Sequence, residues 1–143
     1  MQLPDVNVLI YAHREDAPEH ERYASWLRAA AASPAPVALS EVVLAGFLRI
    51  VTNRRIFDPP TPMETAISFC QGLVVRPRAV FVAPGRRHWD IFVGLCRCVQ
   101  GPLVTDAYLA ALAIEHGCEL MTTDSDFARF PGLRWGHPLR PRR

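Results

Sequence analysis

The sequence predicts an α/β fold, a three-layer α/β/α sandwich with a mainly parallel central sheet. Three observations support this prediction. Short apolar runs alternate along the chain with longer segments of helical periodicity. The connections between them are short, and the thirteen prolines lie largely in these connections. The length of 143 residues suits a single domain that spans residues 1–143.

The strands are predicted from short apolar runs bounded by proline, serine or glycine. Four are expected, at residues 2–4, 37–39, 79–82 and 119–122. Because helical segments separate them, we expect right-handed crossovers and parallel pairing. Residues 134–143 are interpreted as an arginine-rich tail that need not be ordered.

The helices are predicted where apolar residues recur every three or four positions. They are expected at residues 6–12, 18–32, 40–51, 63–73, 87–99 and 105–116. Ser40 and Thr105 are interpreted as the caps of the third and the last helix, and Gly117 ends the last one. In segment 87–99, Trp89 is expected to face the core together with Phe92, Val93 and Cys96.

Charge and cysteine content exclude several classes of protein. Sixteen basic and fourteen acidic residues leave a net charge of +2, too small for binding nucleic acid by bulk charge alone. The four cysteines lack zinc-site spacing, and we expect a reducing, cytoplasmic environment. The longest apolar run, Ala107–Ile114, is too short to span a bilayer, so no membrane association is expected.

Carboxylates follow the predicted strands or begin the predicted helices. Asp5 follows the first strand, Glu41 follows the second, and Asp106 comes directly after Thr105. Asp124 follows the fourth strand, with Asp126 two residues later. Any one of them alone would be interpreted as a helix cap. Because strand ends and helix starts share one edge of such a sheet, we expect these carboxylates to converge there.

Converging carboxylates predict a metal site. Their charges repel, and they stay ionised together only when a cation neutralises them. Ligation by oxygen alone suits Mg²⁺ or Mn²⁺, and no histidine lies at the spacing that zinc would need. A divalent ion held in this way can activate water and stabilise charge on a phosphate.

The segments around these acids resemble the PIN-domain nucleases, and above all the VapC-type toxins of bacterial toxin–antitoxin modules. The resemblance is carried by DVNVLIYA from Asp5, SEVV from Ser40, TDAYLAALA from Thr105 and TTDSDF from Thr122. The segments GFLRIVTNRRIF from Gly46 and RHW at residues 87–89 also resemble one VapC subgroup. Each motif alone is weak, whereas their order and spacing over nearly the whole chain are fairly specific.

This resemblance implies an α/β/α sandwich and endoribonuclease activity that depends on Mg²⁺ or Mn²⁺. By position, the acidic site would comprise Asp5, Glu41, Asp106 and Asp124, with Asp126 as a weaker fifth member. Asp5, Asp106 and Asp124 would hold the metal, and Glu41 would complete its ligands or orient the attacking water. The polar groups expected around them are those of Asn7, Thr105, Thr123 and Ser125.

The resemblance also implies partners, namely an RNA substrate, a cognate antitoxin that blocks the site, and a second copy of the chain in a homodimer. An acidic site alone would repel RNA, and arginines outside it can supply contacts to phosphate. The expected RNA-binding residues are Arg86, Arg87, Arg140, Arg142 and Arg143.

Two alternative functions stay open from the sequence. One is a PIN-like subunit that binds without catalysing a reaction. The other is a phosphatase similar to the haloacid dehalogenases, in which Asp5 would attack phosphate. Asn7 stands where that motif needs a second acid, and the chain has no lysine, so the phosphatase is the less favoured of the two.

Overall fold

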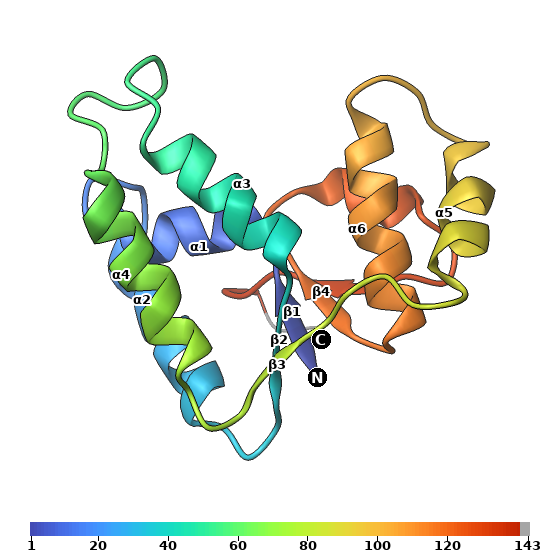
Figure 1. Cartoon of the computed structure of the whole chain (residues 1–143), viewed down its shortest axis with the longest axis horizontal. Coiled ribbons are helices and arrows are strands. Elements are labelled where there is room, and N and C mark those ends of the chain that lie inside the picture. The colour runs from blue at the N-terminus through green and yellow to red at the C-terminus, as the bar shows by residue number, and fades with distance from the viewer. Residues whose placement is uncertain (141–143) are drawn as a thin grey trace.

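A five-stranded parallel sheet forms the centre of the structure, a computed structural model that describes residues 1–140 (Figure 1). The strands lie side by side in the order β3-β2-β1-β4-β5. Their bounds are β1 (Gln2–Pro4), β2 (Val37–Leu39), β3 (Ala79–Phe81), β4 (Glu119–Met121) and β5 (Arg134–Gly136).

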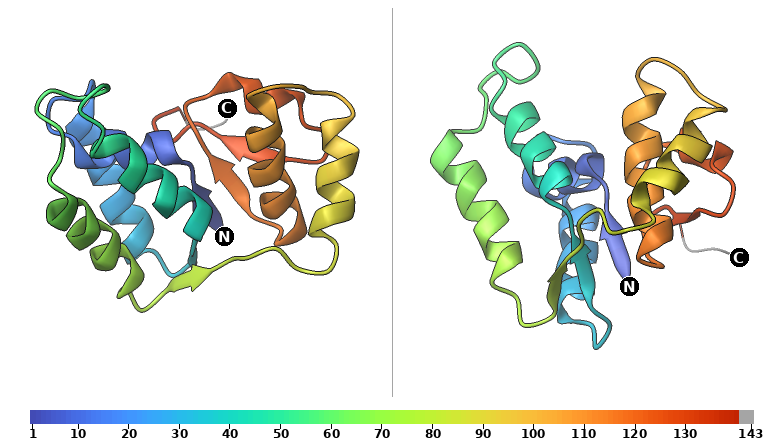
Figure 2. Two further views of the ribbon diagram at one scale, coloured as in Figure 1. Left: turned by 45° about the horizontal axis from the view of Figure 1, so that its top comes forward. Right: turned by 45° about the vertical axis from the view of Figure 1, so that its right-hand side comes forward.

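Helices cover the sheet in two groups. One group packs α1 against α2 and α3, and α3 against α4, while the other pairs α5 with α6. Figure 2 shows the sheet between these groups, which confirms the predicted α/β/α sandwich. The helices are α1 (Val6–His13), α2 (His20–Ala32), α3 (Glu41–Val51), α4 (Met63–Val74), α5 (His88–Cys96) and α6 (Leu103–Glu115), with a 3₁₀ helix, η1 (Ser125–Arg129).

The core lies where both faces of the sheet are covered. The residues of β2 are all buried, and Leu3 of β1 and Leu120 of β4 are fully enclosed. Strands that are covered on both faces read as continuous apolar runs, which is why these short segments were recognisable in the sequence. Helix α6 is buried along Leu109–Ala113, and its alanines allow it to lie close to its neighbours.

The strand order contains one point where the direction of the chain across the sheet reverses. From β1 the chain builds β2 and β3 on one side, then crosses through α5 and α6 to build β4 and β5 on the other. Open α/β sheets bind ligands at the carboxyl ends of the strands beside this point, here between β1 and β4. The register pairs Pro4 with Met121, so Asp5 and Thr122 are the next residues at that edge.

Three predictions about elements were wrong. The segment interpreted as a tail begins with β5, which pairs with β4 from Glu119↔Arg134 to Met121↔Gly136. Helix α6 begins at Leu103 rather than after Thr105, because Pro102 already takes the helical conformation before it. Trp89 is 67% exposed, since α5 buries His88 and Leu95 and the neighbouring position faces outward.

Within residues 1–140, none of the helices combines the length and the apolar character that crossing a membrane requires.

Candidate active site

Asp5 lies where β1 ends and α1 begins. Its carboxylate caps α1 by accepting the backbone N–H of Val6 at 2.6 Å, and its own N–H donates to the Met121 carbonyl at 2.9 Å. The side chain is 5% exposed. The predicted position at the carboxyl edge of the sheet is therefore confirmed for this residue, and the strand pairing that builds the sheet also fixes the carboxylate.

Thr122 and Asn7 hold the other oxygen of Asp5. The Thr122 hydroxyl donates to Asp5 Oδ2 at 2.7 Å, and Asn7 Nδ2 donates to the same oxygen at 3.0 Å. Asn7 Nδ2 also lies 3.3 Å from Thr122 Oγ1, and Asn7 Oδ1 accepts the Thr123 N–H at 3.3 Å. These bonds link α1 to the end of β4 and leave the Asp5 carboxylate a single orientation.

Asp124 follows β4 and caps η1. Its carboxylate accepts the Asp126 N–H at 2.8 Å, and its own N–H donates to Thr122 Oγ1 at 3.1 Å. The hydroxyl of Thr122 thus orders Asp5 and Asp124 together. The Asp126 carboxylate turns to an ion pair with Arg129 at 2.7 Å and is exposed.

Asp106 comes from the opposite side of the site, in the first turn of α6, and is half-buried. Burial raises the pKa of its carboxyl, and the charges of Asp124, Asp5 and Asp126 raise that pKa further. The charges of Asp5 and Asp124 therefore act on Asp106 across this edge of the sheet. Asp5, Asp106 and Asp124 are here called the acidic site.

The pKa of Asp5 is also raised above its ordinary value. Burial is the main cause, and the hydrogen bonds from Thr122, Val6 and Asn7 oppose it. The charge of Asp124 adds a smaller upward contribution. The acidic site therefore disfavours several negative charges at once, which is the electrostatic condition that a bound cation relieves.

The donor chemistry of the acidic site fits a hard divalent cation. Its potential ligands are carboxylate oxygens, and the hydroxyl and amide oxygens of Thr122 and Asn7 lie beside them. Among residues 1–140, no three His, Cys, Asp or Glu side chains are grouped as a set that could hold a metal ion. The case for a divalent cation therefore rests on the oxygen chemistry of these side chains and on the repulsion between the carboxylates.

The other predicted site residues lie at or near this edge of the sheet. Glu41 is exposed at the start of α3, and the register of β2 on β1 places Ser40 level with Asp5. Thr105 is exposed in the first turn of α6, next to Asp106. Thr123 and Ser125 follow β4, but in the described chain neither hydroxyl bonds to the acidic site.

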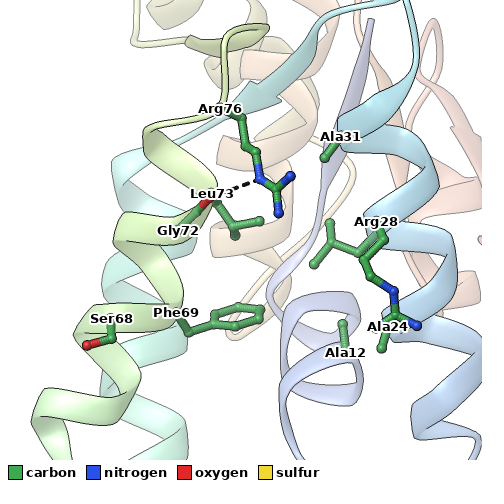
Figure 3. A pocket seen from close by; sticks show the side chains of 10 residues that line it. Ala12, Ala24, Arg28, Ala31, Ser68, Phe69, Gly72, Leu73 and Arg76 are labelled. Carbon is green, nitrogen blue, oxygen red and sulfur yellow. Dashed lines mark hydrogen bonds between the residues drawn. The ribbon is translucent and has the colours of Figure 1, made fainter.

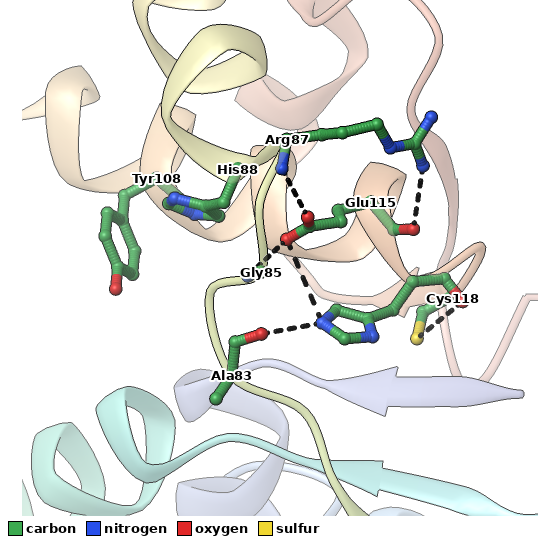
Figure 4. A network of polar contacts seen from close by, with 8 residues as sticks. Ala83, Gly85, Arg87, His88, Tyr108, Glu115 and Cys118 are labelled. Atoms are coloured by element: carbon green, nitrogen blue, oxygen red, sulfur yellow. Dashed lines mark hydrogen bonds and ion pairs between the residues drawn. The ribbon is translucent and has the colours of Figure 1, made fainter.

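Of the predicted RNA-binding arginines, Arg87 is already engaged. Its backbone N–H donates to Glu115 Oε1 at 2.9 Å, and its guanidinium donates to the Glu115 carbonyl at 3.3 Å (Figure 4). Glu115 is nine residues beyond Asp106 on α6, which is about 14 Å along a helix. Arg86 is exposed beside Arg87. Both lie far from the acidic site, and Arg142 and Arg143 lie outside the described residues.

The same network joins the β3–α5 connection to the end of α6. The Gly85 N–H donates to Glu115 Oε2 at 2.8 Å, and His116 Nε2–H donates to the Ala83 carbonyl at 2.7 Å. The two backbone N–H groups of Gly85 and Arg87 lower the pKa of Glu115. We call this set of contacts the Glu115 clamp, and it fixes the far end of the helix that carries Asp106.

A separate groove of about 230 Å³ lies between α2 and α4. Figure 3 shows Leu73 and Phe69 in it, with Arg28 and Arg76 on either side. None of the acidic-site carboxylates lines this groove. The groove is therefore distinct from the site where the carboxylates converge.

Sequence reasoning missed Thr122 as part of the site. Thr122 is 0% exposed and makes three of the contacts that order Asp5, Asn7 and Asp124. The signal that could have found it is strand register. Once β1 and β4 are paired in parallel, the residue after β4 must face the residue after β1.

Fold and site together define a class: an α/β/α protein with an acidic site at the reversal point of a parallel sheet, suited to metal-assisted chemistry on phosphates. The PIN domain family model matches residues 3–133 of the chain. The chain therefore belongs to the PIN domain family.

Curated relatives match almost the entire chain. A VapC ribonuclease of Mycobacterium bovis is 45% identical over 137 residues, which cover 94% of this chain and 93% of the relative. Ribonuclease VapC25 of Mycobacterium tuberculosis is 40% identical over 140 residues, covering 96% and 99%. Divalent-metal dependence is a general property of PIN-domain VapC ribonucleases.

Solved structures share the fold. VapBC2 of Rickettsia felis, solved with a DNA fragment from its promoter, superposes with a TM-score of 0.70 at 20% identity and covers 95% of this chain and 97% of its own. VapC20 of Mycobacterium tuberculosis, described as a toxin that cleaves the sarcin–ricin loop, gives a TM-score of 0.65 at 16% identity, with coverage of 94% and 99%. The α/β/α arrangement is thus that of the VapC structures.

Proposed function

We propose that the protein is a divalent-metal-dependent endoribonuclease and acts as the toxin of a toxin–antitoxin module. The observation that carries this proposal is that Thr122 orders Asp5 and Asp124 together at the β1–β4 junction, while the charges of both acids raise the pKa of Asp106. The 45% identity to a VapC ribonuclease over most of both chains supports the same reaction.

In this proposal Asp5, Asp106 and Asp124 hold Mg²⁺ or Mn²⁺. When bound, the ion supplies the charge that lets the carboxylates ionise together and that stabilises the scissile phosphate in the transition state. Asp5 acts as the fixed ligand because three hydrogen bonds hold its carboxylate. Glu41, exposed at the start of α3, orients the attacking water or completes the ligand set.

Water attacks the phosphorus in line with the leaving 3′ oxygen, which leaves a 5′-phosphate and a 3′-hydroxyl. The role of Asn7 is to hold Asp5 and to bind the backbone beyond β4. Asp126 contributes negative potential at Asp106 while its own carboxylate stays paired with Arg129. Thr105, next to Asp106, is proposed as a polar group beside the acidic site, and the exposed Arg86 is proposed as an RNA contact outside it.

The phosphatase alternative is disfavoured by the surroundings of Asp5. Asn7 donates an N–H to Asp5 and has no acidic proton to give to a leaving group. A purely binding role is disfavoured because the carboxylates expected for catalysis are all present.

We further propose a cognate antitoxin as a protein partner and a homodimer as the free form. Solved assemblies with this fold include VapBC complexes. The acidic site offers an electrostatic target for a basic side chain of an inhibitor. Light scattering of the free protein tests the dimer, and a monomer at micromolar concentration would contradict it.

The decisive experiment compares RNA cleavage by the wild type, Asp5→Asn and Asp106→Asn, with Asp90→Asn as the matched control. Asp90 is an exposed carboxylate on α5 outside the acidic site. Both site variants should lose at least about 100-fold in rate, and the control should match the wild type. Circular dichroism shows whether each variant is folded.

Two results would contradict the proposal: wild-type cleavage by the folded double variant, or full activity in excess EDTA. Restoring activity to EDTA-treated protein with Mg²⁺ and with Mn²⁺, in parallel titrations, identifies the preferred ion. Mapping 5′ ends of cellular RNA after induced expression of wild type and Asp5→Asn locates the cleaved sequence.

A further inference from the structure

The chain beyond β5 closes a pocket beside the acidic site. The pocket has a volume of about 370 Å³ and opens at the carboxyl edge of the sheet. Its walls come from the segment after β4 and from the end of β5 with the turn that follows. The lining residues are Thr123, Ser125, Trp135, Gly136, His137 and Arg140.

Strand register fixes the place of this pocket relative to Asp5. The Thr122 N–H donates to the Gly136 carbonyl at 3.0 Å, so His137 is level with Thr122 on the next strand. Thr122 in turn holds Asp5 on β1. The pocket is therefore about two strand spacings, or roughly 10 Å, from Asp5. A single RNA strand covers that distance in roughly two or three nucleotides.

A short turn, here called the 137–140 turn, builds the outer wall. The Arg140 N–H donates to the His137 carbonyl at 3.2 Å, and the Leu139 N–H donates to His137 Nδ1 at 3.1 Å. His137 Nε2 lies 3.5 Å from the hydroxyl of Tyr23, which is buried in α2. Because Nδ1 accepts a backbone N–H, the ring is held in one orientation, and it acts as an anchor for the turn.

Three side chains of the pocket carry polar groups that a ligand can reach. Arg140 is exposed and, like most arginines among residues 1–140, forms no ion pair with a carboxylate. Within the same part of the chain, the hydroxyls of Thr123 and Ser125 make no hydrogen bond. A guanidinium and two hydroxyls that line the same pocket are donors of the kind that bind phosphate and sugar oxygens.

We propose that this pocket binds an RNA nucleotide that flanks the scissile phosphate. Arg140 contacts the backbone phosphate of that nucleotide, and the hydroxyls of Thr123 and Ser125 bind its phosphate or ribose oxygens. The inference rests on the proposed ribonuclease function. It moves Thr123 and Ser125 from the metal site, where the sequence placed them, to substrate binding.

The first test measures RNA binding without cleavage. Wild type, Arg140→Ala and Arg97→Ala are titrated into a fluorescent single-stranded RNA in EDTA, at several salt concentrations. Arg97 is the matched control, since it is exposed at the end of α5 and away from the pocket. Arg140→Ala should weaken binding about tenfold. It should also reduce the slope of log K against log salt by about 0.7, the loss of one phosphate contact.

The second test locates the contacted phosphate. Cleavable RNAs carry one neutral methylphosphonate at successive positions around the cut. At the position that Arg140 contacts, the neutral linkage and Arg140→Ala should cost no more together than either alone, while at other positions their effects should multiply. The effect should fall on KM more than on kcat. Multiplying effects at every position would overturn the proposal.

The role of His137 as a positioning residue has its own readout. His137→Ala should weaken RNA binding as Arg140→Ala does, and the double variant should bind no more weakly than either single variant.

Full wild-type affinity in both single variants, or equal losses in Arg140→Ala and Arg97→Ala, would overturn the proposal that this pocket binds RNA. If wild type binds RNA through Arg140 but cleaves none, the pocket stands and the catalytic proposal fails. If wild type binds no RNA, both fail.

Discussion

At the scale of single residues, the site depends on a hydroxyl as much as on its carboxylates. Thr122 donates to Asp5 and accepts the N–H of Asp124, so one buried side chain sets the spacing between two acids from different segments. The motif around Asp5 and Asp124 was recognisable in the sequence because acids at strand ends are chemically conspicuous. A threonine at the end of an apolar strand is not conspicuous in this way. The role of Thr122 becomes visible only when the pairing of β4 with β1 is known.

Replacing Thr122 by valine keeps the shape and removes the hydroxyl. Asp5 then loses a hydrogen bond that lowers its pKa, so the pKa rises further. We expect the acid limb of the pH–rate profile to move to higher pH, and unfolding to become easier by about 1–3 kcal/mol. The measurements are kcat against pH and urea denaturation. Thr65→Val, at an exposed position of α4, is the control. An unchanged pH profile would contradict this role.

Asp106 should destabilise the metal-free fold at neutral pH. Its folded pKa is raised by burial and by neighbouring carboxylates, so the folded state holds the proton more tightly than the unfolded chain does. The contribution of the Asp106 carboxyl to the free energy of unfolding is fully present below the pKa of the unfolded chain. It is lost as the pH rises through the pKa of the folded state. In EDTA at pH 7, Asp106→Asn should therefore melt a few degrees above wild type, and the gap should close on acidification. A lower melting temperature would refute this.

At the scale of elements, the four strands that read as short apolar runs were predicted, the edge strand β3 among them, and the other edge strand, β5, was not. The sequence of β5, Arg134-Trp135-Gly136, has neither an apolar run nor an alternation, and arginines follow it. Its strand conformation comes from pairing with β4, a contact between distant segments. The outward position of Trp89 has the same origin, because packing of α5 on α6 selects the buried face.

The Glu115 clamp should hold α6 against the β3–α5 connection. Glu115→Ala removes the acceptor of two backbone N–H groups and should lower the melting temperature at pH 7. The folded pKa is depressed, so the stabilisation is present above the unfolded pKa and is lost as pH falls through the folded value. The deficit should therefore vanish in acid. Hydrogen exchange at Gly85 and Arg87 measures the clamp directly, with Glu15→Ala as the exposed control.

At the scale of the whole molecule, the repulsion between the carboxylates of the acidic site acts at the junction of the two helix groups. A divalent ion that binds there stabilises the folded chain in proportion to the logarithm of its concentration. We expect Mg²⁺ or Mn²⁺ to raise the melting temperature of wild type, and to raise that of Asp106→Asn much less. Differential scanning fluorimetry over a metal titration measures both. Equal shifts in the two proteins would place the ion elsewhere.

The pairing of β1 with β4 also has a consequence for protein synthesis. Asp5 and Thr122 are separated by 117 positions in the chain, yet each needs the other to take its place in the site. During translation Asp5 emerges early, whereas Thr122 emerges only when nearly the whole chain has been made. A fragment that stops before β4 lacks Thr122 and Asp124. Under the proposed function, RNA cleavage therefore begins only when synthesis is almost complete.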